Sequence, residues 1–303
     1  MRTIPYSATK ADLYTPYLRG NYFSGNEAQT TAGLCAELSR LAYARNSPSR
    51  AFDQPLITSV LARIGFAHCG FLESTNSPGG THCFAAVGQM QSSGAQLGIV
   101  VFRGTDADDP TDIGDDADLL LTPWTSGGQV HRGFFGALNQ IEPALGAAVK
   151  AMGCPVLFTG HSLGAALATL AASRYRLAVD SDSALYTIGS PRVGDAGFAA
   201  TLAGMAGRRY VDCTDVVTEV PPEAVGYAHV GPPYYINRNG EISLDPPGLA
   251  IKEDQAAGAA EYLLQYAWRR GDVGVRNLAD HTPLNYVFAV SAAAELGAAA
   301  AGT

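Results

Sequence analysis

The sequence predicts an α/β fold with a mostly parallel central sheet, helices on both faces and antiparallel strands at the start. Strand-like and helix-like patterns alternate over residues 96–213, which is typical of parallel strands joined by crossovers. Before them, strand-like runs in residues 66–102 are separated only by short turn-rich pieces, which favours antiparallel pairing. The chain of 303 residues is 47% hydrophobic and has no internal repeat or long linker. We therefore expect one domain over residues 1–303.

The first elements are expected to lead into this sheet. Residues 1–28 are polar and aromatic without a clear period, so we expect an irregular leading segment. Apolar residues at helical spacing predict a helix over Ala28–Ala44 and a second helix ending at Gly65. The antiparallel strands are expected at Phe66–Glu73, His82–Gln89 and Gln96–Phe102.

The rest of the chain continues the alternation and then becomes loop-rich. Apolar residues on one face predict a helix over Gly133–Met152, and prolines predict loops beyond Asp215. The other expected elements are a strand at Val156–Phe158 with a helix to about Leu177, a strand at Ala184–Ile188, a helix at Asp195–Met205, a strand at Arg208–Cys213 and a helix at Leu284–Ala294.

Composition excludes several classes of function. The formal net charge of -8 argues against nucleic acid and anionic membranes as partners. No segment has the apolar length of a membrane span, and the first residues lack the apolar core of a secretory signal. The expected location is therefore the cytoplasm, or outside the cell by a route that the sequence does not show. Five widely spaced cysteines without a C-x-x-C pair indicate neither a disulfide framework nor a zinc site.

The most informative stretch is Val156–Ala168. An apolar strand, a sharp turn and a helix of small residues surround Gly160-His161-Ser162-Leu163-Gly164. This is the pattern of a nucleophile elbow, in which a strained turn exposes a serine and the helix packs close to the strand. The glycines and alanines are the small neighbours that such packing requires. The alternative is an ordinary strand–turn–helix with a solvent-exposed serine.

A serine nucleophile needs a histidine base and an acid, which follow it in chain order in this type of site. Only His229 and His281 come after Ser162. His281 lies in a polar loop that enters the last helix, whereas His229 lies in an alternating, strand-like piece, so the context favours His281. His161 is adjacent to the serine and is expected to point away from it.

The acid has several candidates. Asp215 is best placed, because it follows a strand directly, where an open α/β sheet presents its functional loops. The alternatives that remain open are Asp212 within the strand, Glu219 and Glu223 in a proline-flanked loop, and Asp195 at the start of a helix.

The two donors of an oxyanion hole are expected to be backbone N–H groups. One belongs to Leu163, the residue after the serine. Thr105 fits the other position, because it follows the strand that ends in Phe102-Arg103-Gly104. An ordinary turn is the alternative for this segment.

The most acidic stretch is Asp106–Asp118, which suggests calcium as a first alternative. An EF-hand loop that began at Asp106 would need glycine at its sixth position and glutamate at its twelfth, where Thr111 and Ala117 stand. We therefore expect a solvated loop, and no metal or cofactor in the protein.

Several blocks of the sequence together resemble the class 3 (fungal-lipase-like) lipase family of α/β-hydrolases. They are Val101–Thr105, Val130–Phe134, Gly160–Ala168, Thr187–Gly194, Thr214–Pro222 and Asp280-His281, in family order. The resemblance implies an α/β-hydrolase fold that cleaves carboxylic esters, especially acylglycerols. It also implies Ser162, Asp215 and His281 as the triad, Thr105 and Leu163 as the oxyanion hole, and His229 as a non-catalytic position.

The chain departs from the family at the candidate lid, residues 106–121. Family lids are often amphipathic, whereas here large apolar residues are concentrated only at Leu119–Leu121 and Trp124. An acidic lid resists docking on lipid, so we expect at most transient contact with lipid surfaces and weak interfacial activation, as in esterase-like members. A phospholipase A1, a feruloyl-type esterase and a catalytically silent lipid-binding protein remain alternative functions. Many secreted members also carry signals and disulfides, which are not evident here.

Overall fold

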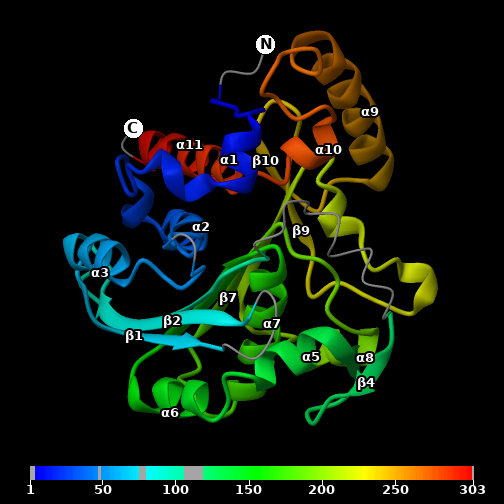
Figure 1. Ribbon diagram of the computed structural model, residues 1–303. Helices are drawn as coiled ribbons and strands as arrows, with labels where there is room; N and C mark the ends of the chain where they lie inside the picture. Colours follow the sequence, from blue (N-terminus) through cyan, green and yellow to red (C-terminus); the bar gives the residue numbers. More distant parts are fainter. Residues whose placement is uncertain (1–3, 47–48, 75–79, 106–118, 302–303) are drawn as a thin grey trace.

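The computed structural model describes residues 4–46, 49–74, 80–105 and 119–301. In these ranges eight strands form one sheet in the order β1-β2-β3-β6-β7-β8-β9-β10 (Figure 1). Strands β1 to β3 are antiparallel, β3, β6, β7, β8 and β9 run parallel, and β10 turns back along β9. The strands are β1 Phe66–Glu73, β2 His82–Gln89, β3 Gln96–Phe102, β6 Val156–His161, β7 Ala184–Ile188, β8 Ala206–Asp212, β9 Pro233–Ile236 and β10 Ile242–Leu244. The predicted fold class is confirmed.

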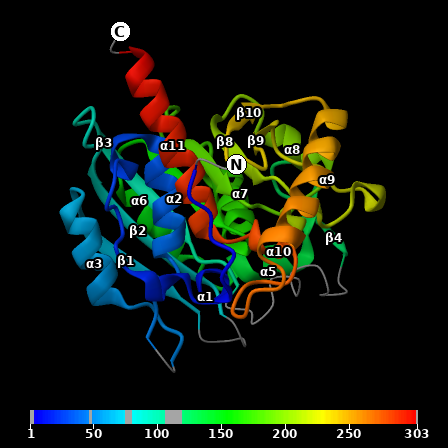
Figure 2. The same cartoon turned by 90° about the horizontal axis from the view of Figure 1, so that it is seen from above.

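Helices cover both faces of this sheet (Figures 1 and 2). Alternation along β3 makes the two cores: Val100 and Phe102 pack with α5, α6 and α7, and Ile99 and Val101 pack with α2 and α3. The α-helices are α1 Lys10–Tyr14, α2 Thr31–Leu41, α3 Gln54–Arg63, α5 Arg132–Asn139, α6 Ala144–Ala151, α7 Leu163–Tyr175, α8 Ala196–Thr201, α9 Gly248–Gln265, α10 Arg276–Ala279 and α11 Pro283–Ala301. A separate pair of short strands, β4 Leu121–Pro123 and β5 Gln129–His131, lies beside this sheet.

Two expectations about secondary structure were wrong. The helix expected over Gly133–Met152 is divided into α5 and α6, and Pro143 occupies the N-cap of α6, where its missing N–H is tolerated. The region beyond Asp215 was expected to be loop-rich, yet it contains β9, β10 and the 18-residue helix α9. Helix α9 buries only Gly258 and Tyr262, so its sequence lacks the apolar stripe by which helices are recognised.

The leading segment contains more regular structure than its sequence suggests. Helix α1 begins after Thr9, whose hydroxyl accepts a bond from the Asp12 N–H, and two 3₁₀ turns follow. The segment is fastened to α11, because the Ser7 N–H and C=O both bond to the Asn285 side chain, at 2.7 and 2.9 Å. Tertiary hydrogen bonds therefore order a segment that has no amphipathic period. The single-domain assignment stays a prediction.

The candidate lid lies largely outside the described residues. Its last part is visible, where Leu119 and Leu120 are exposed and Leu121 begins β4. All five cysteines lie in the described residues and are free thiols. Among the helices described, none combines the length and apolarity needed to cross a bilayer.

Candidate active site

Ser162 stands in the sharp turn between β6 and α7. Its backbone has φ +60° and ψ −131°, a strained conformation for a residue with a side chain, and its N–H donates to the Ile188 carbonyl at 3.0 Å. The turn is possible because its neighbours are small. A Cβ at Gly164 would lie 2.3 Å from the Phe102 carbonyl oxygen, so only glycine lets α7 approach β3 this closely. The strained elbow that the sequence predicts is therefore present.

The His281 side chain joins Ser162 to Asp215. His281 Nε2 lies 2.9 Å from Ser162 Oγ, and His281 Nδ1 lies 2.9 Å from both carboxylate oxygens of Asp215. All three residues are buried. Since a carboxylate only accepts hydrogen bonds, Nδ1 carries the proton, and Nε2 then offers its lone pair to the serine hydroxyl. The structure thus brings together the three residues that the sequence ranked first.

Asp215 is held by its own loop and by the last helix. It follows β8 and caps a short 3₁₀ turn, where Oδ1 accepts a bond from the Val217 N–H at 3.0 Å. Oδ2 accepts a bond of 2.5 Å from the Tyr286 hydroxyl, on α11. Burial and the nearby carboxylate raise the pKa of Tyr286 well above its ordinary value, so the phenol stays protonated and donates. A Cβ at Gly189 would lie 2.8 Å from Oδ2, so a glycine is needed beside this carboxylate.

His161 supports His281 from behind. Its Nε2 donates to the His281 carbonyl oxygen at 2.9 Å, and its Nδ1 accepts from the Tyr43 hydroxyl at 2.8 Å. The two imidazole rings are stacked obliquely, with centroids 4.4 Å apart. Burial, and then the neighbouring His281, lower the pKa of His161 well below its ordinary value. His161 is therefore a neutral group that positions the backbone of His281, and its two ring nitrogens bond to Tyr43 and to the His281 carbonyl rather than to Ser162.

An ion pair under His281 ties three distant segments together. The buried Asp280 carboxylate accepts from Arg276 Nε at 2.9 Å, from the Thr214 N–H and hydroxyl at 3.0 and 2.9 Å, and from the Tyr6 hydroxyl at 2.8 Å. Thr214 precedes Asp215, and Asp280 precedes His281. The hydrogen bonds between Thr214 and Asp280 therefore hold the loop that contains Asp215 beside the segment that contains His281.

The two expected oxyanion donors lie at the ends of neighbouring parallel strands. Leu163 is the first residue of α7, and the first four N–H groups of a helix have no partner within it. Thr105 follows β3, whose Phe102 is paired in register with Gly160 of β6. The Thr105 segment is packed tightly, since a Cβ at Gly104 would lie 2.1 Å from the Tyr43 hydroxyl and 2.8 Å from the His161 carbonyl.

The residues that the sequence ranked lower have other partners. His229 Nε2 donates to the Thr218 carbonyl at 2.8 Å, and burial with nearby Arg209 lowers the pKa of His229 well below its ordinary value. His229 is in no strand, although the adjacent Ala228 forms one isolated bridge. Among the alternative acids, Asp195 caps α8, Glu223 pairs with Arg192, and Glu219 contacts Gln255.

Sequence reasoning missed the groups that hold the triad. Tyr286, Tyr43 and Arg276 lie far from Ser162 in the chain and carry no local motif. The one sequence signal was that an aspartate, Asp280, directly precedes His281, and the burial of its carboxylate is seen only in the structure. For metal binding, the described ranges contain no cluster of three acidic, histidine or cysteine residues suited to an ion. The acidic stretch of residues 106–118 lies outside those ranges.

The sequence is similar to known lipases over its central part. The family model described as "Lipase (class 3)" matches residues 99–225, which confirms the resemblance. A lipase of Rhizomucor miehei is 38% identical over 138 residues, and a secreted mono- and diacylglycerol lipase 1 of Fusarium solani is 37% identical over 130 residues. Each match covers 41% of this chain and only 38% of the relative.

A solved structure extends the likeness beyond this central region. It is a triacylglycerol lipase whose catalytic centre is described as a serine protease triad. The structures share 28% sequence identity with a TM-score of 0.54, and the match covers 68% of this chain and 78% of the other. The likeness and the sheet order together confirm the α/β-hydrolase fold.

Proposed function

We propose, from the class 3 lipase match over residues 99–225, that this chain is a serine hydrolase that cleaves carboxylic esters. One observation carries the proposal: a strained, buried Ser162 lies 2.9 Å from a histidine whose other nitrogen is bound to Asp215. This is the arrangement that turns a weak hydroxyl nucleophile into a reactive one. Acylglycerols are the proposed substrate class, because the matched relatives are named for them or for lipase activity.

The first half of the reaction acylates the serine. His281 Nε2 takes the proton of Ser162 Oγ as this oxygen attacks the ester carbonyl. The negative charge that develops on the carbonyl oxygen is stabilised by the backbone N–H groups of Leu163 and Thr105. His281 then gives its proton to the leaving alcohol, and the acyl group remains on Ser162.

The second half regenerates the enzyme. Water gives its proton to His281 Nε2 and attacks the acyl group, and the carboxylic acid leaves as Ser162 recovers its proton. In both halves Asp215 keeps the neutral His281 ring in the tautomer with its proton on Nδ1, and it stabilises the imidazolium that forms when Nε2 takes a second proton. The Tyr286 hydroxyl contributes by orienting the Asp215 carboxylate, and His161 contributes by holding the backbone of His281.

Covalent labelling tests this proposal directly. A fluorophosphonate reacts with a serine only when a neighbouring base activates it. We expect one equivalent of label on the peptide that contains Ser162, located by mass spectrometry, and no label after heat denaturation. Folded protein that stays unlabelled would indicate a catalytically silent binding protein instead.

The acidic stretch that precedes β4 predicts how the enzyme behaves at an interface. Residues 106–118 contain seven aspartates, and this expectation depends on their sequence alone. We expect the rate on tributyrin to rise by no more than about twofold as the substrate passes its solubility limit, because carboxylates resist burial in lipid. A variant with Asp106, Asp108 and Asp109 changed to asparagine serves as the control and is expected to show a larger rise. A sharp rise with the unmodified protein would contradict the expectation.

A further inference from the structure

A cavity of about 400 Å³ lies on the α7 side of the sheet, against β7 and β8. It exists because little covers this part of the sheet: α8 has only six residues, and residues 213–232, which connect β8 to β9, contain 3₁₀ turns and no α-helix. Ser162, His281 and Asp215 are not among its lining residues. Its volume is within the range of small-molecule sites, which is roughly 300–1,000 Å³.

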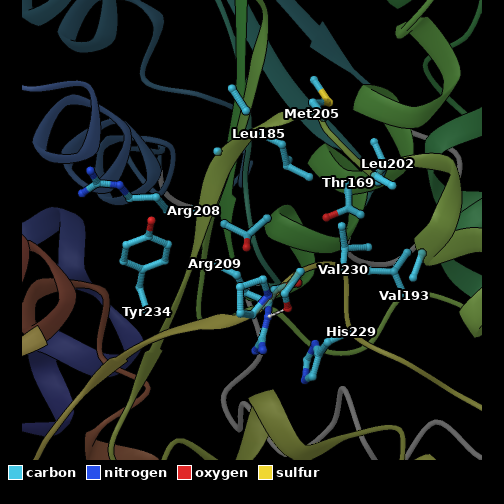
Figure 3. Close-up of a pocket in the computed structure, with 18 of the residues that line it drawn as sticks. Thr169, Leu185, Val193, Leu202, Met205, Arg208, Arg209, His229, Val230 and Tyr234 are labelled. Atoms are coloured by element: carbon cyan, nitrogen blue, oxygen red, sulfur yellow. Dashed lines mark hydrogen bonds between the residues drawn. The ribbon is translucent and has the colours of Figure 1, made fainter. Parts of the chain in front are cut away.

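One end of the cavity is apolar (Figure 3). Leu185, Leu202 and Met205 line this end, and Val193 and Val230 line an adjacent wall. Two nearby hydroxyl groups already have acceptors, since Thr169 donates to the Ala165 carbonyl and Ser190 donates to the Pro191 carbonyl. This end therefore suits an aliphatic group rather than a polar one.

The opposite end carries Arg209 (Figure 3). Arg209 on β8 is paired in register with Thr187 on β7, so its side chain lies on the same face of the sheet as the cavity. Arg209 Nε donates to the Gly231 carbonyl at 3.3 Å. Among the described residues, no side chain or carbonyl accepts a hydrogen bond from its two terminal nitrogens, and no carboxylate pairs with it. This half-buried cation therefore has unused donors at the cavity.

Among the described residues, the charged groups near Arg209 form no ion pair with it, although the Asp245 carboxylate is near enough to favour its charged form. Arg192 is itself held, by Glu223 at 3.0 Å and by the carbonyls of Glu219 and Pro221. His229 is neutral at neutral pH, because burial and the nearby cations Arg209 and Arg192 lower its pKa well below the ordinary value. Burial and nearby Arg192 lower the pKa of Arg209 to about 10, which still leaves it charged at neutral pH. A charge placed in this way is stabilised by an anionic partner.

We propose that this cavity binds an amphipathic anion, an aliphatic chain that ends in a carboxylate, with the carboxylate on Arg209 and the chain toward Leu202 and Met205. A guanidinium binds a carboxylate through two parallel hydrogen bonds, which fits the two unused terminal nitrogens. The proposed hydrolysis would release fatty acids of this class, but binding at the cavity does not depend on that reaction.

Binding is measured by isothermal titration calorimetry in the Ser162→Ala variant, so that turnover plays no part. The probes are decanoate, decanol and acetate. We expect decanoate to bind at least about tenfold more tightly than decanol, which lacks the charge, and acetate, which lacks the chain, to show no measurable binding. Equal binding of decanoate and decanol, or saturable binding of acetate, would overturn the proposal.

Variants then locate the site. Adding Arg209→Gln to the Ser162→Ala variant is expected to weaken decanoate binding about tenfold or more and to leave decanol binding unaltered. The matched control is Arg63→Gln, because Arg63 ends α3 on the opposite face of the sheet, donates to the Tyr22 carbonyl at 3.1 Å and is not among the residues that line the cavity. Its effect is expected to be less than twofold. Equal losses in the two variants would refute the role of Arg209.

A second variant guards against loss of folding. Leu202→Trp enlarges a side chain at the apolar end, and it is expected to reduce the binding of decanoate and of decanol alike. Circular dichroism and thermal melting confirm that each variant is folded before it is titrated. If folded Leu202→Trp binds decanoate as tightly as its parent, the ligand lies elsewhere and the proposal is wrong. Because all arms use the Ser162→Ala background, their outcome is independent of whether the chain hydrolyses esters.

Discussion

Replacing Ser162 with alanine is expected to lower kcat/KM for a p-nitrophenyl ester by about ten-thousand-fold or more. The hydroxyl is the atom that attacks in the proposed mechanism, and no other described hydroxyl lies within hydrogen-bonding distance of His281 Nε2. The change is small in volume and keeps the Cβ, so it leaves the backbone strain at the positive φ unaltered, and the folded state is expected to persist. The measurement is initial rate against substrate concentration, with circular dichroism as a check on folding.

The matched control is Ser173→Ala, a buried serine near the end of α7, the helix that follows Ser162. Its hydroxyl accepts a bond from Trp124 Nε1 at 2.9 Å and lies away from the triad. We expect this variant to lose about 2 kcal/mol of stability, since it removes the hydrogen bonds to Trp124 and to the Thr201 hydroxyl, while its rate stays within a few-fold of the parent. Near-normal turnover in Ser162→Ala would show that another residue is the nucleophile.

The second large effect is expected at His281, in comparison with His229. His281→Ala is expected to reduce kcat/KM by about ten-thousand-fold, because the serine loses its base and the leaving alcohol loses its acid. His229→Ala is expected to cost less than about tenfold, because the His229 ring bonds to the Thr218 carbonyl and is not in contact with Ser162.

Both variants remove an imidazole of the same size, but His281 is fully buried and bonds to Asp215 and Ser162, whereas His229 is partly buried and bonds only to the Thr218 carbonyl, so stability is measured for each variant. Rates are measured at equal fractions of folded protein, judged from urea titration. Comparable losses in both variants would indicate a structural rather than a catalytic effect. The reverse ranking would assign the base to His229.

Much of the fold could be predicted from sequence because its signals are local. The turn-rich pieces between β1, β2 and β3 favour hairpin-like pairing, and the alternation from β3 to β8 favours parallel crossovers; both patterns are present in the sheet. Helix α9 could not be predicted, because most of its surface is exposed and no apolar period marks it. Helices α5 and α6 were expected as one helix, because the apolar face continues across the break.

The candidate site also contains residues that the local sequence identifies and residues that only the fold brings together. Ser162 is recognisable because its elbow needs a strand, small neighbours and a helix within a few residues. Asp215 and His281 are separated in the chain by 66 residues, and the Asp215 to Tyr286 contact spans 71. Chain order and loop position select the first pair, but no pattern within the sequence connects Tyr286 to Asp215.

The sequence by itself determined the elements whose causes are close together in the chain: the strained turn at Ser162, the parallel strands and the small residues that let α7 pack on β3. Only the tertiary structure decided which distant side chains meet. It placed Tyr286 against Asp215 and His161 against His281, and among the described residues it gave Arg209 no ion-pair partner beside an apolar cavity. The physical reason is that a side chain's environment depends on sheet order and on which helices cover each face. Those are properties of the packed chain rather than of any short segment.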